Sequence, residues 1–196
     1  NGFELTQRHV NAIKSSREKL EKFPTSAKIY FSGDQLPEVG ALLVQHDLAV
    51  TLKTIASNGS HAFYKGEIAK KIVKFMEQNG GLITATDLAS YQAKLRNPVY
   101  GTYRGYDVYS MPPPSSGGIH VIQILNILEG YDFRGTERYS AEFTHLLAEA
   151  MKLAFADRAH FLGDSDFVDV PVAGLISKPY AEEQRSKINT DQVLEL

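Results

Sequence analysis

Two serines and a histidine stand at the start of an apolar segment, where their spacing could support nucleophilic catalysis. Ser116 and His120 are four residues apart, which places their side chains on one face of a helix, and Ser115 directly precedes them. A hydroxyl with an imidazole beside it is the arrangement of a nucleophile and its general base. However, the G-x-S-x-G turn is missing, and a serine between prolines and an apolar helix is typical of an N-cap. We therefore expect Ser115 or Ser116 to cap the helix rather than to attack a substrate.

The glycines after these serines suggest an anion site as a second possibility. Free amide groups and the helix dipole favour an anion at a helix N-terminus, and Gly117 and Gly118 allow close approach to the backbone. The segment lacks the lysine of a P-loop and the spacing GxGxxG. The preceding run Pro112 to Pro114 has no amide protons and must end a strand. We therefore expect a structural junction, which comprises Pro113, Pro114, Ser115, Ser116, Gly117 and Gly118.

Carboxylates at alternating positions follow the last long helical segment and could bind a hard cation. Asp164, Asp166 and Asp169 would supply oxygen ligands. The glycine and the closing glutamate of an EF-hand are missing, so we favour solvated or capping carboxylates. Just before them, Asp157 and Arg158 are adjacent in a helix and point in different directions, which predicts partners on other elements.

The remaining histidines show no metal-binding spacing. His9, His46, His61 and His145 do not form HExxH or a similar motif, so we interpret them as packing or surface residues. Cysteine is absent, which excludes disulfides, cysteine nucleophiles and thiolate metal sites in this sequence. We expect neither a metal nor a cofactor.

Composition and charge narrow the class of protein. The 196 residues are 43% hydrophobic and 22% charged, as is usual for a globular domain or part of one. A net charge of -2 without runs of like charge gives no footprint for nucleic acid. The longest apolar stretch, Ile119 to Leu128, is shorter than the roughly 20 residues that span a bilayer. Because the sequence starts at Asn1 without a leader, we expect an upstream segment to have been removed.

Helical periodicity and stop signals define the N-terminal half. A mostly exposed helix is predicted from Glu4 to Phe23, and Pro24 ends it. Residues 25–44 read as a connector, with Ile29 to Phe31 as a possible short strand, so residues 1–44 form an N-terminal helix and connector. Three further helices are predicted: from Asp47 to Asn58-Gly59, around Ile68 to Met76, and from Thr84 to Tyr91 with a capping box to Asp87.

The C-terminal half begins with a predicted β-hairpin. Val99 to Tyr103 and Tyr106 to Ser110 are rich in aromatic and β-branched residues, and Arg104-Gly105 separates them. Helices are predicted near Ser116 to Glu129 and Ala141 to Leu162. The tail 187–196 has no clear partner, and we expect it to be poorly ordered. The sequence therefore predicts a single domain over 1–196 of the α+β class, predominantly helical with a small antiparallel hairpin.

Three stretches of this chain resemble γ-glutamyltranspeptidases (glutathione hydrolases), members of the N-terminal nucleophile hydrolase superfamily. The similarity runs from about Gly33 to Tyr180 and includes LAVTLKTIASNGSHAFYKGEIAKKIV, NGGLITATDLASYQAKLRNPVYGTYRGYDVYSMPPPSSGGIHVIQILNILE and AEAMKLAFADRAHFLGDSDFVDVP, in that order. The resemblance implies a precursor that cleaves itself into a large and a small subunit, which interleave in an αββα sandwich. It places this chain in the C-terminal part of the large subunit.

The same resemblance implies that the catalytic groups lie elsewhere. The family's nucleophile is the first threonine of the small subunit, whose hydroxyl attacks the γ-glutamyl carbonyl with its own α-amine as base. The acyl group then passes to water or to an amino acid. Asn1 has no hydroxyl, and Leu196 precedes the family's Thr-Thr-His-Tyr motif. The substrate-binding arginine lies in a stretch upstream of Asn1, and the oxyanion-hole glycines belong to the small subunit, so we expect no catalytic residue here.

Two functions are compatible with this sequence. The first is a scaffold for a γ-glutamyltranspeptidase-like enzyme, with the small subunit as partner and γ-glutamyl compounds such as glutathione as substrates. Cephalosporin acylases and capsule depolymerases share the pattern, so the acyl substrate stays open. The second is a stand-alone noncatalytic domain that binds a peptide or a partner. The resemblance also implies a periplasmic or secreted protein.

Overall fold

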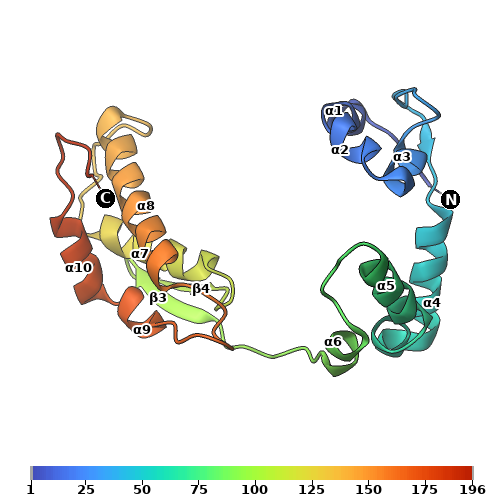
Figure 1. The fold of residues 1–196 in the computed structure, drawn as a ribbon. Helices are drawn as coiled ribbons and strands as arrows, with labels where there is room; N and C mark the ends of the chain where they lie inside the picture. The colour runs from blue at the N-terminus through green and yellow to red at the C-terminus, as the bar shows by residue number, and fades with distance from the viewer. Residues whose placement is uncertain (1, 196) are drawn as a thin grey trace. The chain divides into compact units, whose positions relative to one another are not determined.

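The computed structural model describes residues 2–195, which form two compact units that meet in sequence between Ala93 and Lys94 (Figure 1). The expectation of a single domain over 1–196 stays a prediction.

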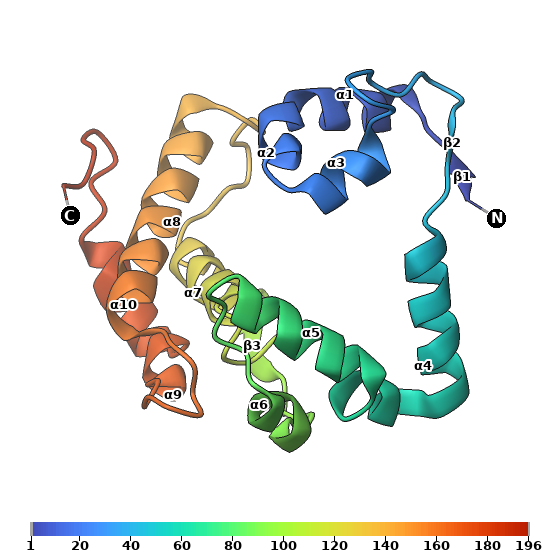
Figure 2. The same ribbon diagram turned by 45° about the vertical axis from the view of Figure 1, so that its right-hand side comes forward.

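The first unit is mainly helical, with one two-stranded ladder and an isolated bridge between Ser32 and Gln35. Strand β1 (Phe3–Glu4) pairs antiparallel with β2 (Leu42–Leu43), a pairing that the sequence analysis missed because each strand has only two residues. Helix α5 packs against α4 and α6 (Figure 2). The helices of this unit are α1 (Gln7–Ser15), α2 (Arg17–Glu21), α3 (Pro24–Tyr30), α4 (His46–Tyr64), α5 (Glu67–Gln78) and α6 (Ala85–Ser90).

Two predictions for the N-terminal segment are wrong. The single helix expected from Glu4 to Phe23 is divided into α1 and α2 at Ser16, whose backbone leaves the helical region. The segment Ile29 to Phe31, which we considered as a possible short strand, does not form one, because most of it belongs to α3. Pro24 occupies the first turn of α3, where proline's fixed φ suits a helix and its missing amide proton costs nothing. Pro24 therefore starts a helix in addition to ending one.

Helix boundaries further along follow the local signals more closely. The helix that we expected to end at Asn58-Gly59 is broken there, because Gly59 has non-helical backbone angles (φ 63°, ψ -159°), and a second helical stretch within α4 continues to Tyr64. The capping box of α6 is confirmed: the Asp87 amide donates to Thr84 Oγ1 at 3.2 Å, and the Thr84 amide donates to Asp87 Oδ2 at 2.8 Å.

The second unit contains the predicted hairpin. Strands β3 (Val99–Tyr103) and β4 (Tyr106–Ser110) pair antiparallel, with Val99 opposite Ser110 and Tyr103 opposite Tyr106. Both turn residues have positive φ, 49° at Arg104 and 87° at Gly105, as a two-residue hairpin turn of type I′ requires. The hairpin is confirmed with the predicted boundaries.

Helix α7 (Gly117–Glu129) is the centre of this unit. It packs on the hairpin through Ile119 and Ile122, and on α8 (Ala141–Phe161) and α10 (Lys178–Ser186) through Ile127 and Leu128. The short helix α9 (Val172–Leu175) adds Leu175 to the hairpin side of this core. Lys178 Nζ joins the elements by donating to Thr102 O at 2.7 Å and to Glu129 Oε2 at 2.5 Å. The predicted class, mainly helical with a small antiparallel hairpin, is confirmed.

The C-terminal segment has contacts that the sequence did not reveal. Residues 187–195, expected to lack a clear partner, contact α8 through Asn189 and Leu194. Ile188 and Leu194 also pack against the core formed by α7, α8 and α10. No helix between residues 2 and 195 has the length and apolar character needed to cross a bilayer.

Candidate functional site

The proline-serine junction connects β4 to α7 by a tight path. Ser110 ends β4 and Gly117 begins α7, and the amide of Ser115 donates to the Pro112 carbonyl at 3.1 Å across the proline run. The Pro113–Pro114 peptide bond is cis. The strand ends before the prolines, as predicted, and the chain turns directly into the helix.

The two serines of the junction have different partners. We expected Ser115 or Ser116 to cap α7, and for Ser116 this expectation is wrong. Ser116 has helical backbone angles, and its side chain accepts no hydrogen bond from the first turn of α7. An N-cap residue ordinarily adopts an extended conformation, which lets its oxygen reach back to the helix amides. Ser115 Oγ accepts a long hydrogen bond from the Gly117 amide at 3.4 Å. Ser116 Oγ instead accepts from Arg158 Nε at 3.2 Å and so links the start of α7 to α8.

The two glycines of the junction also differ. A Cβ at Gly118 would lie 2.2 Å from the Met111 carbonyl oxygen and 2.7 Å from a methyl group of Val99. A Cβ at Gly117 would meet only the Ser115 hydroxyl, at 3.7 Å. Gly118 is thus required for the close approach of α7 to the end of the hairpin, whereas Gly117 has space.

Ser116 and His120 do not form a nucleophile and base. The Ser116 hydroxyl receives its hydrogen bond from Arg158, a cation that cannot accept a proton. The His120 ring stacks on Phe155 with 5.3 Å between ring centroids, and the residue is 7% exposed. Burial, followed by the charge of Arg158, lowers the pKa of His120. Among residues 2–195, His120 Nε2 has no hydrogen-bond partner. The geometry therefore supports a packed histidine.

A buried polar network behind the junction was not predicted from the sequence. Gln123 Nε2 donates to Asp157 Oδ2 at 2.7 Å, and the Tyr180 hydroxyl donates to Asp157 Oδ1 at 2.9 Å. Burial and the hydrogen bond to Asp157 raise the pKa of Tyr180 to about 12. Asp157 thus contacts α7 and α10 while Arg158 contacts the junction, which confirms that these neighbours have partners on other elements. These hydrogen bonds connect α7, α8 and α10 next to the junction.

A shallow surface pocket of about 430 Å³ lies beside the junction. Its wall includes Pro114, Ser116, Arg158, Leu162 and Asp164. A guanidinium and a carboxylate thus line the same pocket, so the positive potential that an anion site needs is opposed by Asp164. This arrangement does not favour the anion hypothesis for Gly117 and Gly118.

The aspartates after α8 do not gather around a common point. Asp166 accepts from Arg96 Nη2 at 2.6 Å and from Lys94 Nζ at 2.9 Å, and these hydrogen bonds lower its pKa to about 2. Asp164 Oδ1 accepts from the Asp166 amide at 3.0 Å, a capping contact of the kind we favoured. Over residues 2–195, no group of three histidine, aspartate or glutamate side chains is placed to hold a metal.

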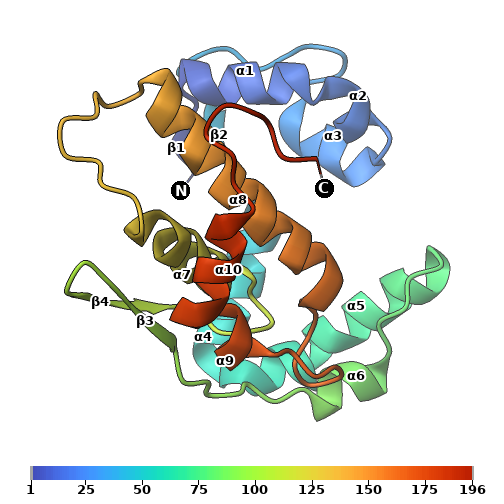
Figure 3. The same cartoon turned by 90° about the vertical axis from the view of Figure 1, so that its left-hand side faces the viewer.

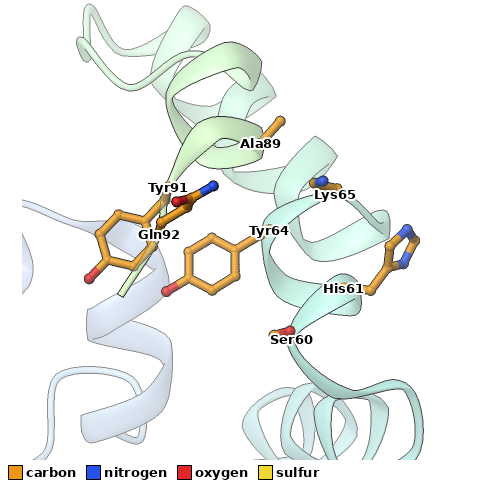
Figure 4. Close-up of a pocket in the computed structure, with 7 residues that line it drawn as sticks. All are labelled: Ser60, His61, Tyr64, Lys65, Ala89, Tyr91 and Gln92. Atoms are coloured by element: carbon orange, nitrogen blue, oxygen red, sulfur yellow. The ribbon is translucent and has the colours of Figure 1, made fainter. Parts of the chain in front are cut away.

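The first unit has a small pocket between the end of α4 and the segment after α6. Tyr64 and Tyr91 stack there, with 5.1 Å between their centroids, and Figure 4 shows His61 pointing away from this pair. The other labelled side chains of the wall are Ser60, Lys65, Ala89 and Gln92. The pocket has aromatic and amide groups but no carboxylate, and its geometry suggests no catalytic pair.

Two further histidines have structural roles. The Thr6 amide donates to His9 Nδ1 at 3.1 Å at the start of α1. His145 Nε2 lies 2.8 Å from the Asn189 carbonyl oxygen. Both agree with the interpretation of the histidines as packing or surface residues.

Comparisons with known proteins find similar proteins that match nearly the whole chain. The sequence model of the γ-glutamyltranspeptidase family matches residues 1–195. The chain is 46% identical to the glutathione hydrolase proenzyme of Escherichia coli over 97% of its own length and 33% of that protein. It is also 46% identical to the acylase ACY 1 proenzyme of a Pseudomonas species, over 97% of its length and 34% of that protein.

A solved structure is similar to the same extent. The γ-glutamyltranspeptidase of Helicobacter pylori superimposes with a TM-score of 0.93 and 46% sequence identity, over 98% of this chain and 56% of that one. The chain spans about a third of the length of the curated relatives that it matches.

Proposed function

The chain belongs to the γ-glutamyltranspeptidase family, and from this premise we propose that it is the C-terminal part of the large subunit of a γ-glutamyltransferase and glutathione hydrolase. The whole enzyme would transfer the γ-glutamyl group of glutathione and related compounds to water or to amino acids. The observation that carries the proposal is the match of the family model to residues 1–195. Similarity to the Helicobacter pylori enzyme over 98% of the chain supports it.

In this proposal the reacting groups lie outside these residues. A threonine at the start of the small subunit would attack the γ-glutamyl carbonyl through its hydroxyl, and its α-amine would take the proton. The γ-glutamyl amide bond would then break, and the departing amine would receive this proton. The acyl group would then leave the threonine for water or an amino acid. Residues 2–195 would serve as scaffold, because Ser116 and His120 do not form a nucleophile and base.

The exposed surface of the second unit is evidence that a partner binds to the hairpin. Tyr106, Tyr109 and Met111 are exposed, and β3 and β4 pair only with each other among the described residues. Strands with unpaired edges readily accept a further strand. We propose that strands of the small subunit, released from the same precursor, cover this hairpin. We also propose a periplasmic or secreted location, which fractionation of cells that express the whole gene would test.

The experiment uses the full-length gene. Its product should mature into two chains, which intact mass spectrometry detects, and the mature protein should hydrolyse γ-glutamyl-p-nitroanilide. Residues 1–196 alone should show no turnover. A full-length product that stays one chain and has no activity would contradict the proposal. Turnover by residues 1–196 that disappears in Ser116→Ala would restore the serine hypothesis.

A second candidate function is the hydrolysis of another acyl group. The ACY 1 proenzyme is named an acylase and is as similar to this chain as the glutathione hydrolase is. Parallel assays of the mature protein with a γ-glutamyl anilide and with a cephalosporin side-chain amide separate the two. The alternative of a stand-alone binding domain is less well supported, because the chain matches only about a third of each relative.

A further inference from the structure

The most deeply buried acidic side chain of the described residues lies away from the junction, on α8. Glu149 is 2% exposed and its carboxylate has two partners. Lys152 Nζ lies 3.0 Å from Glu149 Oε1, and the amide of Leu194 donates to Glu149 Oε2 at 3.1 Å. A buried carboxylate destabilises the fold unless it is paired and hydrogen-bonded. One of the two partners that offset this cost therefore comes from the C-terminal segment.

Lys152 also contacts Leu194. Its Nζ also donates to the carbonyl oxygen of Leu194. Glu149 and Lys152 thus bind the main-chain N–H and C=O of Leu194. Neither contact depends on which side chain stands at position 194. Burial raises the pKa of Glu149, but the hydrogen bonds from Lys152 and Leu194 outweigh this effect, and the net pKa lies below its ordinary value. The carboxylate is thus in its charged, hydrogen-bond-accepting form near neutral pH.

Other contacts hold the remainder of the segment. His145, Glu149 and Lys152 occupy one stripe of α8, and His145 lies against the Asn189 carbonyl oxygen. Ile188 and Leu194 pack against the core at the two ends. Figure 3 shows the segment leaving α10 and passing along α8. We call residues 188–194 the C-terminal strap.

We propose that Glu149 and Lys152 form a main-chain clamp that holds the C-terminal strap on α8, and that this clamp directs the path of the chain from the large-subunit scaffold toward the cleavage site of the precursor. The clamp itself consists of the contacts of Glu149 and Lys152 with the main chain of Leu194. Its role in cleavage rests on the proposed function. Autocleavage requires the scissile bond in a defined geometry, and a fixed strap reduces the conformations that the following residues explore. Glu149 and Lys152 are therefore positioning residues.

The test is hydrogen exchange on the full-length precursor, followed in peptides that cover 188–195. In Glu149→Ala, the amide of Leu194 should exchange about tenfold faster or more, as loss of a hydrogen bond to a charged group implies. Lys152→Met removes the contact with the carbonyl and should act in the same direction. Lys152→Arg keeps a cationic donor and should retain slow exchange. Glu142→Gln is the matched control, because Glu142 is an exposed carboxylate on the same helix.

The rate of precursor cleavage is measured in the same variants. Glu149→Ala and Lys152→Met should lengthen the half-life of the precursor several-fold, whereas Lys152→Arg and Glu142→Gln should not. Unchanged exchange of the strap in both Glu149→Ala and Lys152→Met would refute the clamp. Faster exchange with unchanged cleavage would refute its positioning role. If the wild-type precursor does not cleave at all, the proposed function fails, and the exchange data still decide whether the clamp exists.

Discussion

The two glycines of the junction differ in the space that surrounds them, and so in whether they tolerate a larger side chain. Gly118 lies against the Met111 carbonyl and Val99, whereas the neighbouring Gly117 has open space. The sequence SSGG gives the two glycines the same appearance. Only the packing of α7 against the hairpin distinguishes them.

This difference predicts the effect of two alanine substitutions. Gly118→Ala should lower the free energy of unfolding by roughly 1–3 kcal/mol, because the new methyl group must displace backbone atoms. Gly117→Ala should change it by less than about 1 kcal/mol. Chemical denaturation of the whole protein measures both. Equal effects of the two substitutions would contradict the role given to Gly118.

Asp166 should make the stability of the protein depend on pH. Its pKa lies at about 2 in the folded state, below the ordinary value of 3.8, because Arg96 and Lys94 bind its carboxylate. A lowered folded-state pKa stabilises the protein above the unfolded pKa, and this contribution disappears as the pH falls from about 4 through about 2. The difference in unfolding free energy between wild type and Asp166→Asn should therefore be constant above pH 5 and shrink below pH 4. A difference that stays constant down to pH 2 would contradict the ion pairs.

At the scale of elements, the hairpin is held by its turn and by its contact with α7. Arg104 and Gly105 take positive φ in the turn, and Gly101 gives Ile122 of α7 the room to pack, since a Cβ there would lie 2.6 Å from an Ile122 methyl group. The turn residues fix the register, and the register places Val99 and Val108 against the core. A change in the turn should thus affect the entire second unit.

Gly105→Ala tests the turn. A φ of 87° is unfavourable for a residue with a Cβ, so the substitution should lower the unfolding free energy by about 1–2 kcal/mol. Gly174→Ala in α9 is the matched control: no atom lies within 4 Å of the place that the new methyl group would take, and alanine is the better helix former. If both substitutions change thermal unfolding equally, alanine is not strained at position 105, and this explanation of the turn is wrong.

At the scale of the whole molecule, both units leave apolar surface uncovered. In the second unit, Tyr109 is 65% and Met111 is 66% exposed beside unpaired strand edges. In the first unit, Leu48, Leu52 and Phe75 are also exposed. Apolar surface of this kind ordinarily belongs to an interface. It agrees with a chain that spans about a third of its curated relatives.

Residues 1–196 produced alone should therefore self-associate. Light scattering should show a mass that rises with concentration, and co-expression with the remaining part of the precursor should suppress this rise. Tyr109→Lys, which places a charge beside the hairpin edge, should reduce association without unfolding the hairpin. A strict monomer at high concentration would mean that the hairpin edges do not attract further strands.

The sequence by itself determined the elements whose signals are local. The hairpin boundaries follow from the aromatic and β-branched runs on either side of Arg104-Gly105, the capping box of α6 from Thr84 and Asp87, and α7 and α8 from their apolar periodicity. The family resemblance, and with it the placement in the large subunit, came from residues in order along the chain. The hairpin, the capping box and the helices depend on neighbours within a few positions, which a sequence shows directly.

Only the tertiary structure decided which side chains meet. Ser115 or Ser116 was expected to cap α7, whereas Ser116 binds Arg158, which is 42 residues away in the sequence. Gln123 and Tyr180 converge on Asp157, and Leu194 reaches Glu149 across 45 residues. These partners depend on how α7, α8 and α10 pack. For the buried carboxylates of Asp157 and Glu149, leaving them without these hydrogen bonds would cost free energy.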